Sequence, residues 1–290
     1  MFSMKLELVC ENSMCRLLAL VGRNLGGYLD YVDSFKTASE CDPYLAELSG
    51  SETCGSHSDG WGYAVVGVDR DGRLVSQHYR TTVPVFHDQE GLNYLKSMLS
   101  RYSLLSAIVH SRKLAEGSAR IVNTHPLHFS WKGFEMWLAH NGLMDSEALS
   151  RDLSMSRISD ITDTYYLGEY VYRALSCVNK KELVEALKNA ARYTKTAMNT
   201  LIILYDDNKM ITSISFYLTK NRMSNPSAFK YYKILTRNFG EFYAFFSSSL
   251  LHYLNSKESI EELPPQSVAI VEINLETTRI EDYSVHTLLY

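Results

Sequence analysis

Short runs of apolar residues, each ended by glycine or by polar residues, mark where strands are expected. Cys15–Gly22, Ser106–Ser111 and Phe134–His140 are three such runs in the first half of the chain, and the third ends at Asn141-Gly142. Runs of about four to eight residues are typical of strands that are buried on both faces. Further strands are expected at Thr200–Tyr205, Met210–Leu218, Tyr231–Thr236, Phe242–Ser247 and Ser267–Asn274.

Turn and helix signals fill the space between these runs. Gly62–Val68 and Arg73–Arg80 flank the turn sequence Asp-Arg-Asp-Gly and predict a hairpin, and Gly50–Gly60 is a Ser- and Gly-rich loop. Helical spacing of apolar residues occurs at Val32–Leu48, Gly91–Tyr102, Asp145–Leu153, Ile161–Cys177 and Lys180–Ala191, the last preceded by Asn179 as a cap. Strands are followed by helices and then by strands again, with no linker between them. Two sheets between layers of helices would bury all of these elements.

Composition narrows the class of protein. The 290 residues are ample for a buried core, and 46% of them are hydrophobic. A net charge of −4 without a basic block argues against nucleic acid as a partner. Apolar runs such as Asn199–Tyr205 and Phe242–Leu251 are too short to span a bilayer, and the first residues lack the apolar stretch of a secretory signal. We therefore expect a cytoplasmic protein without a membrane partner.

The five cysteines are widely spaced, odd in number and without a CxxC pair. This pattern argues against a disulfide scaffold and against a cysteine-rich zinc site. Cys177 lies in the apolar stretch Tyr170–Val178 and is expected to be a small buried hydrophobe. The pattern assigns no role to Cys10, Cys41 or Cys54.

Cys15 has a special chemical possibility because it directly follows Met14. If the chain began at Cys15, its α-amine, with a pKa of about 7.7–8.0, could serve as a base for its own thiol. The thiol has a pKa of about 8.5 and is a good nucleophile once deprotonated. For a Met-Cys pair taken alone, an ordinary buried cysteine is the commoner outcome.

Three further elements carry groups suited to binding a charged substrate. Arg112, in His-Ser-Arg, can pair its planar guanidinium with a carboxylate, although a surface ion pair is the commoner role of a single arginine. Asn141 and Gly142 offer a side-chain amide and a backbone N–H to an oxyanion, and taken alone they are a plain turn. Asp163, in Thr-Asp-Thr, can bind an ammonium group or simply cap a helix.

Two more elements contain glycines or histidines. The segment His57–Tyr63 contains Asp-Gly-Trp-Gly, in which Gly60 flanks Trp61 and allows close approach of the backbone, or serves as a structural entry into the hairpin. His125, in Thr-His-Pro, is followed by His128 at a spacing that could bind a metal. Neither a carboxylate nor a cysteine joins the two histidines at ligand spacing, so zinc is disfavoured.

Taken in order, these elements resemble the class II glutamine amidotransferase family. Met-Cys-Arg, Asp-Gly-Trp-Gly, His-Ser-Arg, Thr-His-Pro, His-Asn-Gly and Thr-Asp-Thr follow one another between Cys15 and about Tyr170, most closely as in the small single-domain members. The resemblance implies the four-layer αββα sandwich of the N-terminal-nucleophile hydrolases, an α+β fold. It also implies that no metal or organic cofactor is needed.

The resemblance further implies roles for single residues. Cys15 would attack the side-chain carboxamide of glutamine, and Asn141 and Gly142 would form the oxyanion hole. Arg112 would bind the substrate's α-carboxylate and Asp163 its α-ammonium group. A last set is expected to line the substrate site: Gly60, Trp61 and His125.

Two departures from the family pattern affect these expectations. Residues 1–14 precede Cys15, so we expect them to be an extension upstream of a true start at Met14, or a propeptide, followed by one domain over residues 15–290. An uncleaved extension would block the amine. The Gly-rich Arg-Gly-Gly stretch of many relatives is replaced by residues 49–58, so the loop beside the pocket is expected to differ.

The expected function is hydrolysis of glutamine by Cys15, through a γ-glutamyl thioester and with release of ammonia. Without a fused acceptor domain, the ammonia would pass to a partner synthase. Three alternatives remain open: a hydrolase of another γ-glutamyl amide or peptide, a non-catalytic domain that binds glutamine-like ligands, and a papain-like hydrolase that uses Cys54 with a histidine. The last is disfavoured because Cys54 lies in a Ser- and Gly-rich loop.

Overall fold

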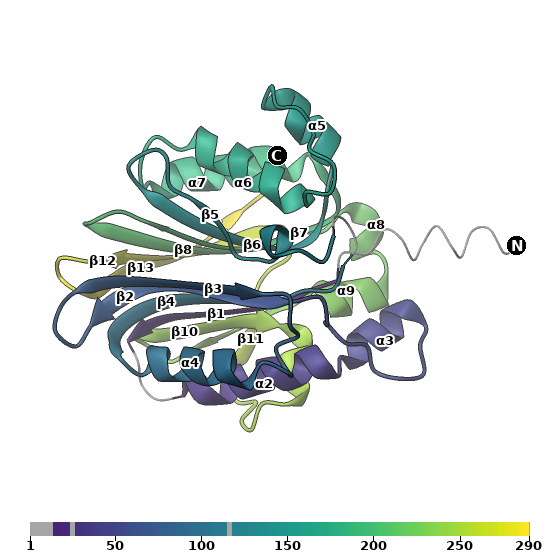
Figure 1. Ribbon diagram of the computed structural model, residues 1–290, viewed down its shortest axis with the longest axis horizontal. Coiled ribbons are helices and arrows are strands. Elements are labelled where there is room, and N and C mark those ends of the chain that lie inside the picture. Colours follow the sequence, from purple (N-terminus) through teal and green to yellow (C-terminus); the bar gives the residue numbers. More distant parts are fainter. Residues whose placement is uncertain (1–13, 24–26, 115–117, 290) are drawn as a thin grey trace, which may run out of the picture.

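Two antiparallel sheets lie face to face, with helices on both outer faces (Figure 1). The structure is a computed structural model and describes residues 14–23, 27–114 and 118–289. The helices α6 (Asp163–Ala174) and α7 (Lys180–Ala191) cover one sheet, and α2 (Tyr28–Glu40) and α4 (Gln89–Leu99) cover the other. The αββα order expected from the sequence is confirmed.

Within the described residues, the larger sheet has seven strands. In spatial order they are β11 (Ile260–Glu262), β9 (Ile234–Asn238), β10 (Phe242–Ser247), β1 (Arg16–Arg23), β4 (Tyr102–Ser111), β2 (Trp61–Asp69) and β3 (Leu74–Thr81). The second sheet has six strands in the same part of the chain. They are β13 (Arg279–Thr287), β12 (Ser267–Asn274), β8 (Lys209–Phe216), β7 (Thr194–Tyr205), β6 (Glu135–Met144) and β5 (Leu127–Phe129).

Shorter helices lie at the ends of the sandwich. They are α3 (Pro43–Ser49), α5 (Ser146–Asp152), α8 (Lys220–Met223) and α9 (Pro226–Tyr232), with single 3₁₀ turns at Ile121–Asn123 and Ser248–His252. Figure 1 shows α3 and α9 side by side at the end of the molecule where β1 begins. None of the helices in the described ranges is both long and apolar enough to cross a membrane.

The alternation of side chains along β1 explains why its sequence is a continuous apolar run. Leu17, Ala19 and Val21 pack between the two sheets. Leu18 and Leu20 point to the opposite face, where they pack with residues of α2 and α4. Successive side chains of a strand point to opposite faces, so a strand covered on both sides needs apolar residues at every position.

The register of the larger sheet gathers three of the sequence elements at one end. Arg16 pairs with Ser111 on the neighbouring strand β4, and Trp61 on β2 pairs with the same Ser111 from the other side. Because both pairs are antiparallel, the residue before β1 and the residue after β4 lie at the same end of the sheet. Cys15 and Arg112 therefore start from neighbouring positions.

Some elements differ from those expected. The single helix expected over Val32–Leu48 is two helices, because Asp42 caps α3 and Pro43 occupies its first turn. The strand expected to stop at Asn141-Gly142 continues to Met144 as β6. Tyr231 and Tyr232 end helix α9 and do not begin a strand. The sequence analysis did not anticipate the strands β5, β11 and β13 or the helices α8 and α9.

The expectation for Cys177 was wrong, and one disulfide was not anticipated. Cys177 is exposed, because it follows the end of α6 in the turn before α7. Cys41 and Cys54, which had no assigned role, form a disulfide with a Cα–Cα distance of 5.0 Å. They flank the bridge in which the backbones of Asp42 and Gly55 exchange hydrogen bonds of 2.7 and 3.1 Å. The disulfide also removes Cys54 as the thiol of a papain-like site.

Replacing both disulfide cysteines, Cys41→Ser with Cys54→Ser, is expected to lower the free energy of unfolding by about 2–4 kcal/mol, because the unfolded chain loses a cross-link. Urea denaturation without reductant measures the change. The control is Cys177→Ser at an exposed position, expected to stay within about 0.5 kcal/mol of wild type. Equal stabilities of the double variant and the control would contradict the disulfide.

Candidate active site

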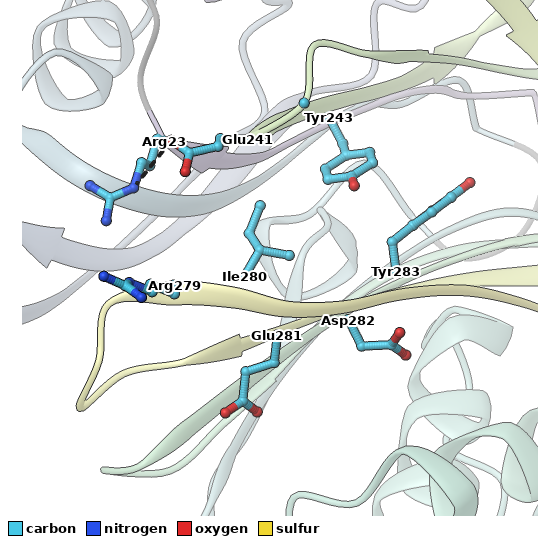
Figure 2. A pocket seen from close by; sticks show the side chains of 9 residues that line it. Arg23, Glu241, Tyr243, Arg279, Ile280, Glu281, Asp282 and Tyr283 are labelled. Carbon is cyan, nitrogen blue, oxygen red and sulfur yellow. Dashed lines mark ion pairs between the residues drawn. The ribbon is translucent and has the colours of Figure 1, made fainter.

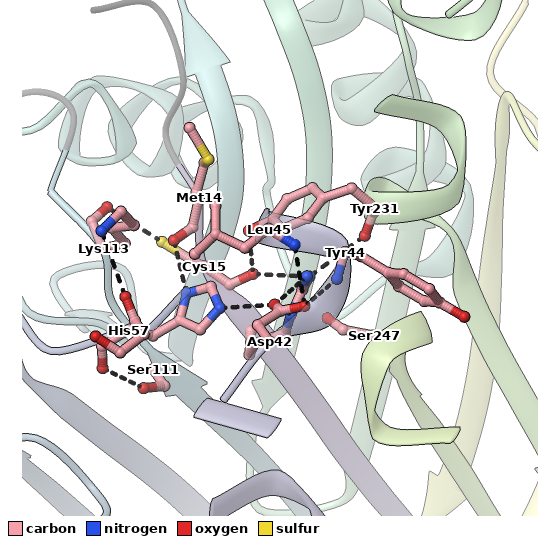
Figure 3. Close-up of polar contacts among 12 residues, drawn as sticks. Met14, Cys15, Asp42, Tyr44, Leu45, His57, Ser111, Lys113, Tyr231 and Ser247 are labelled. Atoms are coloured by element: carbon pink, nitrogen blue, oxygen red, sulfur yellow. Dashed lines mark hydrogen bonds and ion pairs between the residues drawn. The ribbon is translucent and has the colours of Figure 1, made fainter. Parts of the chain in front are cut away.

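Cys15 lies immediately before β1 and is 1% exposed. Its backbone N–H donates to Asn141 Oδ1 on β6, at a distance of 3.0 Å. Its Sγ lies 3.9 Å from the carbonyl oxygen of Lys113, just beyond β4 (Figure 3). The residue thus sits where the ends of the two sheets meet, in contact with both of them.

Asn141 and Gly142, the expected pair of donors, follow each other on β6 beside Cys15. Because Asn141 Oδ1 accepts from Cys15, the amide Nδ2 points elsewhere, and it is buried without a hydrogen-bond partner among the described residues. Gly142 has a φ of +148°, and a Cβ there would lie 1.8 Å from the carbonyl oxygen of Ala197. Only glycine fits this position. The amide Nδ2 is therefore available to a ligand or to a water molecule, since buried donors are almost always satisfied.

Arg112 and Asp163 place opposite charges near the same point. Arg112 is 3% exposed, and its Nη1 donates to the carbonyl of Ser118 at 2.9 Å. Burial lowers the pKa of its guanidinium, while Cys15 as a thiolate and the carboxylates of Asp59 and Asp163 act in the opposite direction. Asp163 begins α6 and accepts from the backbone N–H groups of Met144 (2.6 Å) and Thr164 (2.9 Å). Its carboxylate is therefore fixed at a helix N-terminus.

Of the remaining expected site residues, Gly60 and His125 border this region, whereas the side chain of Trp61 lies in the core on the other side of the sheet. The carbonyl of Gly60 accepts from the backbone N–H of Arg112 at 2.8 Å, so the glycine helps to fix the arginine. Trp61 is fully buried in the core against α4, where its Nε1 donates to Asp88 at 2.9 Å. His125 is 3% exposed, and its Nδ1 lies 3.1 Å from Nε2 of His110.

A buried cluster that the sequence analysis did not identify lies behind Cys15 (Figure 3). The carboxylate of Asp42 forms an ion pair with Arg16 and lies 2.8 Å from Nε2 of His57. It also accepts from the backbone N–H groups of Tyr44 (3.0 Å) and Leu45 (3.2 Å) as the cap of α3. All three charged or titratable side chains, Arg16, Asp42 and His57, are 0% exposed.

Two pKa shifts describe this cluster. Burial acts to raise the pKa of Asp42, but Arg16 and the hydrogen bond from His57 outweigh it and lower the pKa to about 2. Burial lowers the pKa of His57, although Asp42 acts to raise it. Near neutral pH, Asp42 is therefore charged and the imidazole of His57 beside it is neutral.

Local signals in the sequence could have found part of this cluster. The dipeptide Asp42-Pro43 is a helix-start signal, since aspartate is favoured as a cap and proline in the first turn. His57 stands two residues before the Asp-Gly-Trp-Gly element. Nothing local points to Arg16 as their partner, because 26 residues separate it from Asp42.

A surface cavity and a metal site are the other features that could carry a function. A cavity of about 370 Å³ opens beside Arg23, Tyr243, Arg279 and Tyr283 (Figure 2). Arg23 ends β1 and Cys15 precedes it, so this cavity lies at the opposite end of the strand from the candidate site. In the part of the chain that the structure describes, no three His, Cys, Asp or Glu residues are grouped so that they could hold a metal.

Comparison with known proteins bears on this geometry. The family profile described as "Glutamine amidotransferases class-II" matches residues 34–206, which is more than half of the chain. The matched range includes Arg112, Asn141, Gly142 and Asp163, and Cys15 precedes it. No curated protein sequence matches the chain.

Two solved structures share the fold. One is the allosteric regulatory enzyme of purine biosynthesis, with 17% identity and a TM-score of 0.56. The other is glutamine phosphoribosylpyrophosphate amidotransferase from B. subtilis in complex with ADP and GMP, with 18% identity and a TM-score of 0.54. Each comparison covers 94% of this chain and 49% of the other, so the chain spans about half the length of these structures.

Replacing the central carboxylate, Asp42→Asn, is expected to lower the free energy of unfolding at neutral pH by about 3–5 kcal/mol, because Arg16 stays buried without its counter-charge. The matched control is Asp145→Asn at the cap of α5, where asparagine caps as well as aspartate.

The same carboxylate predicts part of the acid sensitivity of the wild type. A pKa lowered from 3.8 to about 2 means that Asp42 contributes its full stability above pH 4 and loses it as pH falls toward 2. Thermal denaturation across this range should show a shallower pH dependence for Asp42→Asn than for wild type. Parallel curves for the two proteins would contradict the assignment.

Proposed function

Because the chain belongs to the class II glutamine amidotransferases, we propose that it cleaves the side-chain amide of glutamine with Cys15 as an N-terminal nucleophile. The observation that carries the proposal is the contact between Cys15 and Asn141. It places the thiol-bearing residue beside a buried amide whose Nδ2 lacks a partner among the described residues. The reactive form is the chain that begins at Cys15, since a peptide bond at this nitrogen would remove the base.

The first half of the reaction forms an acyl-enzyme. The α-amine of Cys15 takes the proton of its own thiol, and the thiolate attacks the γ-carboxamide carbon of glutamine. The oxygen of the tetrahedral intermediate carries the developing negative charge. Asn141 Nδ2 and the backbone N–H of Gly142 donate to it from buried positions, where such donors are most effective.

The second half releases both products. The tetrahedral intermediate collapses, its C–N bond breaks, and the α-ammonium group gives its proton to the departing ammonia. A γ-glutamyl thioester on Cys15 remains. Water then attacks the thioester, glutamate leaves, and the thiol is restored. The ammonia passes to an acceptor enzyme, as in family members that work with a synthase partner.

The far end of glutamine needs two charged partners. Arg112 is proposed to bind the α-carboxylate and Asp163 the α-ammonium group. The influence of Asp163 and of a Cys15 thiolate on the pKa of Arg112 supports this arrangement, because both groups lie within electrostatic reach of the guanidinium. Gly60 supports Arg112 through the backbone, and His125 borders the same region through His110.

The test of the function is Asn141→Asp. The change removes the NH₂ donor and adds a negative charge beside the oxyanion, so kcat for glutamine should fall at least ~10²-fold. Glutamate release, alkylation of Cys15 by a glutamine-like affinity label and thermal stability are followed together, on protein whose first residue is shown by mass to be Cys15. Near wild-type turnover by a folded variant would refute the proposed oxyanion hole.

The control for this change is Asn93→Asp on the exposed side of α4, which should leave turnover unchanged. Glutamine and a γ-glutamyl peptide are assayed in parallel to identify the amide that is cleaved. Failure of the Cys15-first wild type to cleave either amide would favour a domain that only binds such ligands.

A second change tests the carboxylate contact. Arg112→Lys keeps the charge but loses the planar pair of donors, so kcat/KM for glutamine should fall by about tenfold to 100-fold, mainly through KM. The melting temperature should change little. Arg80→Lys is the control, because Arg80 is partly buried and, like Arg112, donates to a backbone carbonyl, that of Thr124, at 3.2 Å. Unchanged kcat/KM in Arg112→Lys would remove this arginine from the substrate site.

A further inference from the structure

We propose that His57, held by Asp42, positions the free α-amine of Cys15 by accepting a hydrogen bond from it at Nδ1. In the active protein this bond occupies the space that the carbonyl of Met14 fills here. The inference rests on the proposed function, in which the amine of Cys15 is the catalytic base. It adds a second acceptor for that amine and gives the buried cluster behind the nucleophile a function.

The contacts of the imidazole ring carry the inference. Nε2 of His57 lies 2.8 Å from Oδ2 of Asp42, and Nδ1 lies 2.9 Å from the carbonyl oxygen of Met14 (Figure 3). That carbonyl belongs to the peptide bond of Cys15, so the nitrogen of Cys15 is bonded to the same carbon. His57 is thus fixed by a carboxylate on one side and faces the amino end of the nucleophile on the other.

The chain that retains Met14 leaves this ring poorly matched. A carboxylate and a carbonyl oxygen only accept, whereas a neutral imidazole has a single N–H to donate. Burial favours the neutral ring, and Asp42 remains charged. One ring nitrogen therefore either faces an acceptor without a proton between them or carries a charge that burial disfavours.

Removing Met14 resolves the mismatch. The carbonyl acceptor disappears, and an amine that can donate takes its place beside Nδ1. Nε2–H then donates to Asp42 while Nδ1 accepts from Cys15, so a neutral imidazole satisfies both contacts. The ring prefers the processed form of the chain for this reason.

The contact with His57 also constrains the hydrogens of the amine. A neutral α-amine has two N–H bonds and one lone pair. In this structure the nitrogen of Cys15 already donates to Asn141 Oδ1 at 3.0 Å. With His57 accepting the second N–H, both hydrogens are fixed, and the lone pair is the one group on the nitrogen left to take the thiol proton of Cys15. A base aimed at the proton it removes is what general-base catalysis requires.

Other charged or titratable groups also act on His57 or on the side chain of Cys15. Those that face the two groups from neighbouring elements are Arg16, Asp42, His110, Arg112, Tyr231 and Tyr232. All of them remain in place when only His57 is replaced. A change in the pH profile between wild type and a His57 variant therefore reports the contact of His57 itself.

Replacing His57 by glutamine or by asparagine allows the two ring nitrogens to be tested separately. His57→Gln places an amide near the position of Nε2 and keeps a partner for Asp42, but loses the acceptor that faces Cys15. His57→Asn places an amide near Nδ1 and keeps that acceptor, but loses the contact with Asp42. His87→Gln is the control, because His87 is exposed and remote from the cluster.

In protein that begins at Cys15, His57→Gln is expected to lower kcat/KM by about tenfold to 100-fold. The acid limb of its pH profile should move to lower pH, because the protonated amine loses an acceptor that stabilises it. His57→Asn should keep the acid limb of the wild type, and His87→Gln should match the wild type throughout. If both His57 variants lose activity in step with the melting temperature while the acid limb stays in place, His57 is a packing residue and the proposal is overturned.

A measurement on unchanged protein tests the contact without any variant. ¹⁵N NMR of the histidine rings distinguishes a protonated from an unprotonated nitrogen. In the Cys15-first protein, His57 should be neutral, with the proton on Nε2 and with Nδ1 as an acceptor. A proton on Nδ1 would overturn the proposal. If this protein cleaves no amide but shows the expected ring, the proposed function fails and the contact of His57 with the amine stands.

Discussion

The buried carboxylate of Asp42 is the constraint on which this end of the molecule depends. A charge taken out of water costs several kcal/mol unless it is paired and hydrogen-bonded. Asp42 meets that condition with Arg16, with His57 and with the first backbone N–H groups of α3. Arg16 opens β1, so the pairing fixes the start of the strand and with it the position of Cys15. Packing alone leaves a strand end free to fray, whereas this one is held by charge.

The candidate site exists because two sheets end at the same place. Apolar side chains between the sheets set their separation, and Cys15 and Asn141 bridge the gap where those side chains stop. The residues involved are 126 positions apart in the chain. Strand ends suit this purpose, since their backbone groups are no longer all used by neighbouring strands. Gly142, with no room for a Cβ, lets β6 lie close to the backbone of β7 there.

Much of the fold could be predicted because its strands are buried on both faces and therefore appear as continuous apolar runs. The bounds of β10 and β12 agree with those expected, and the order of short motifs identified the family that the profile match supports. The features that the sequence did not predict depend on pairing between distant residues or on strands that are partly exposed. The disulfide joins the end of a helix to a loop, and Arg16 meets Asp42 across 26 residues. The strand β13 alternates exposed and partly buried residues, a pattern that reveals strands at the edge of a sheet but is weaker than an apolar run.

The place of β1 has a consequence for how the chain is made. Chain ends usually fray and remain open to trimming. Here Met14 is 5% exposed and Cys15 1% exposed, and the strand they lead into is flanked by β10 and β4. An aminopeptidase must draw an extended end into its own cleft, which a residue enclosed in a finished sheet cannot provide. In the proposed mechanism, exposure of Cys15 as the first residue would therefore belong to the interval of biosynthesis before the sheet closes, and the closed sheet would then protect the new end from further digestion.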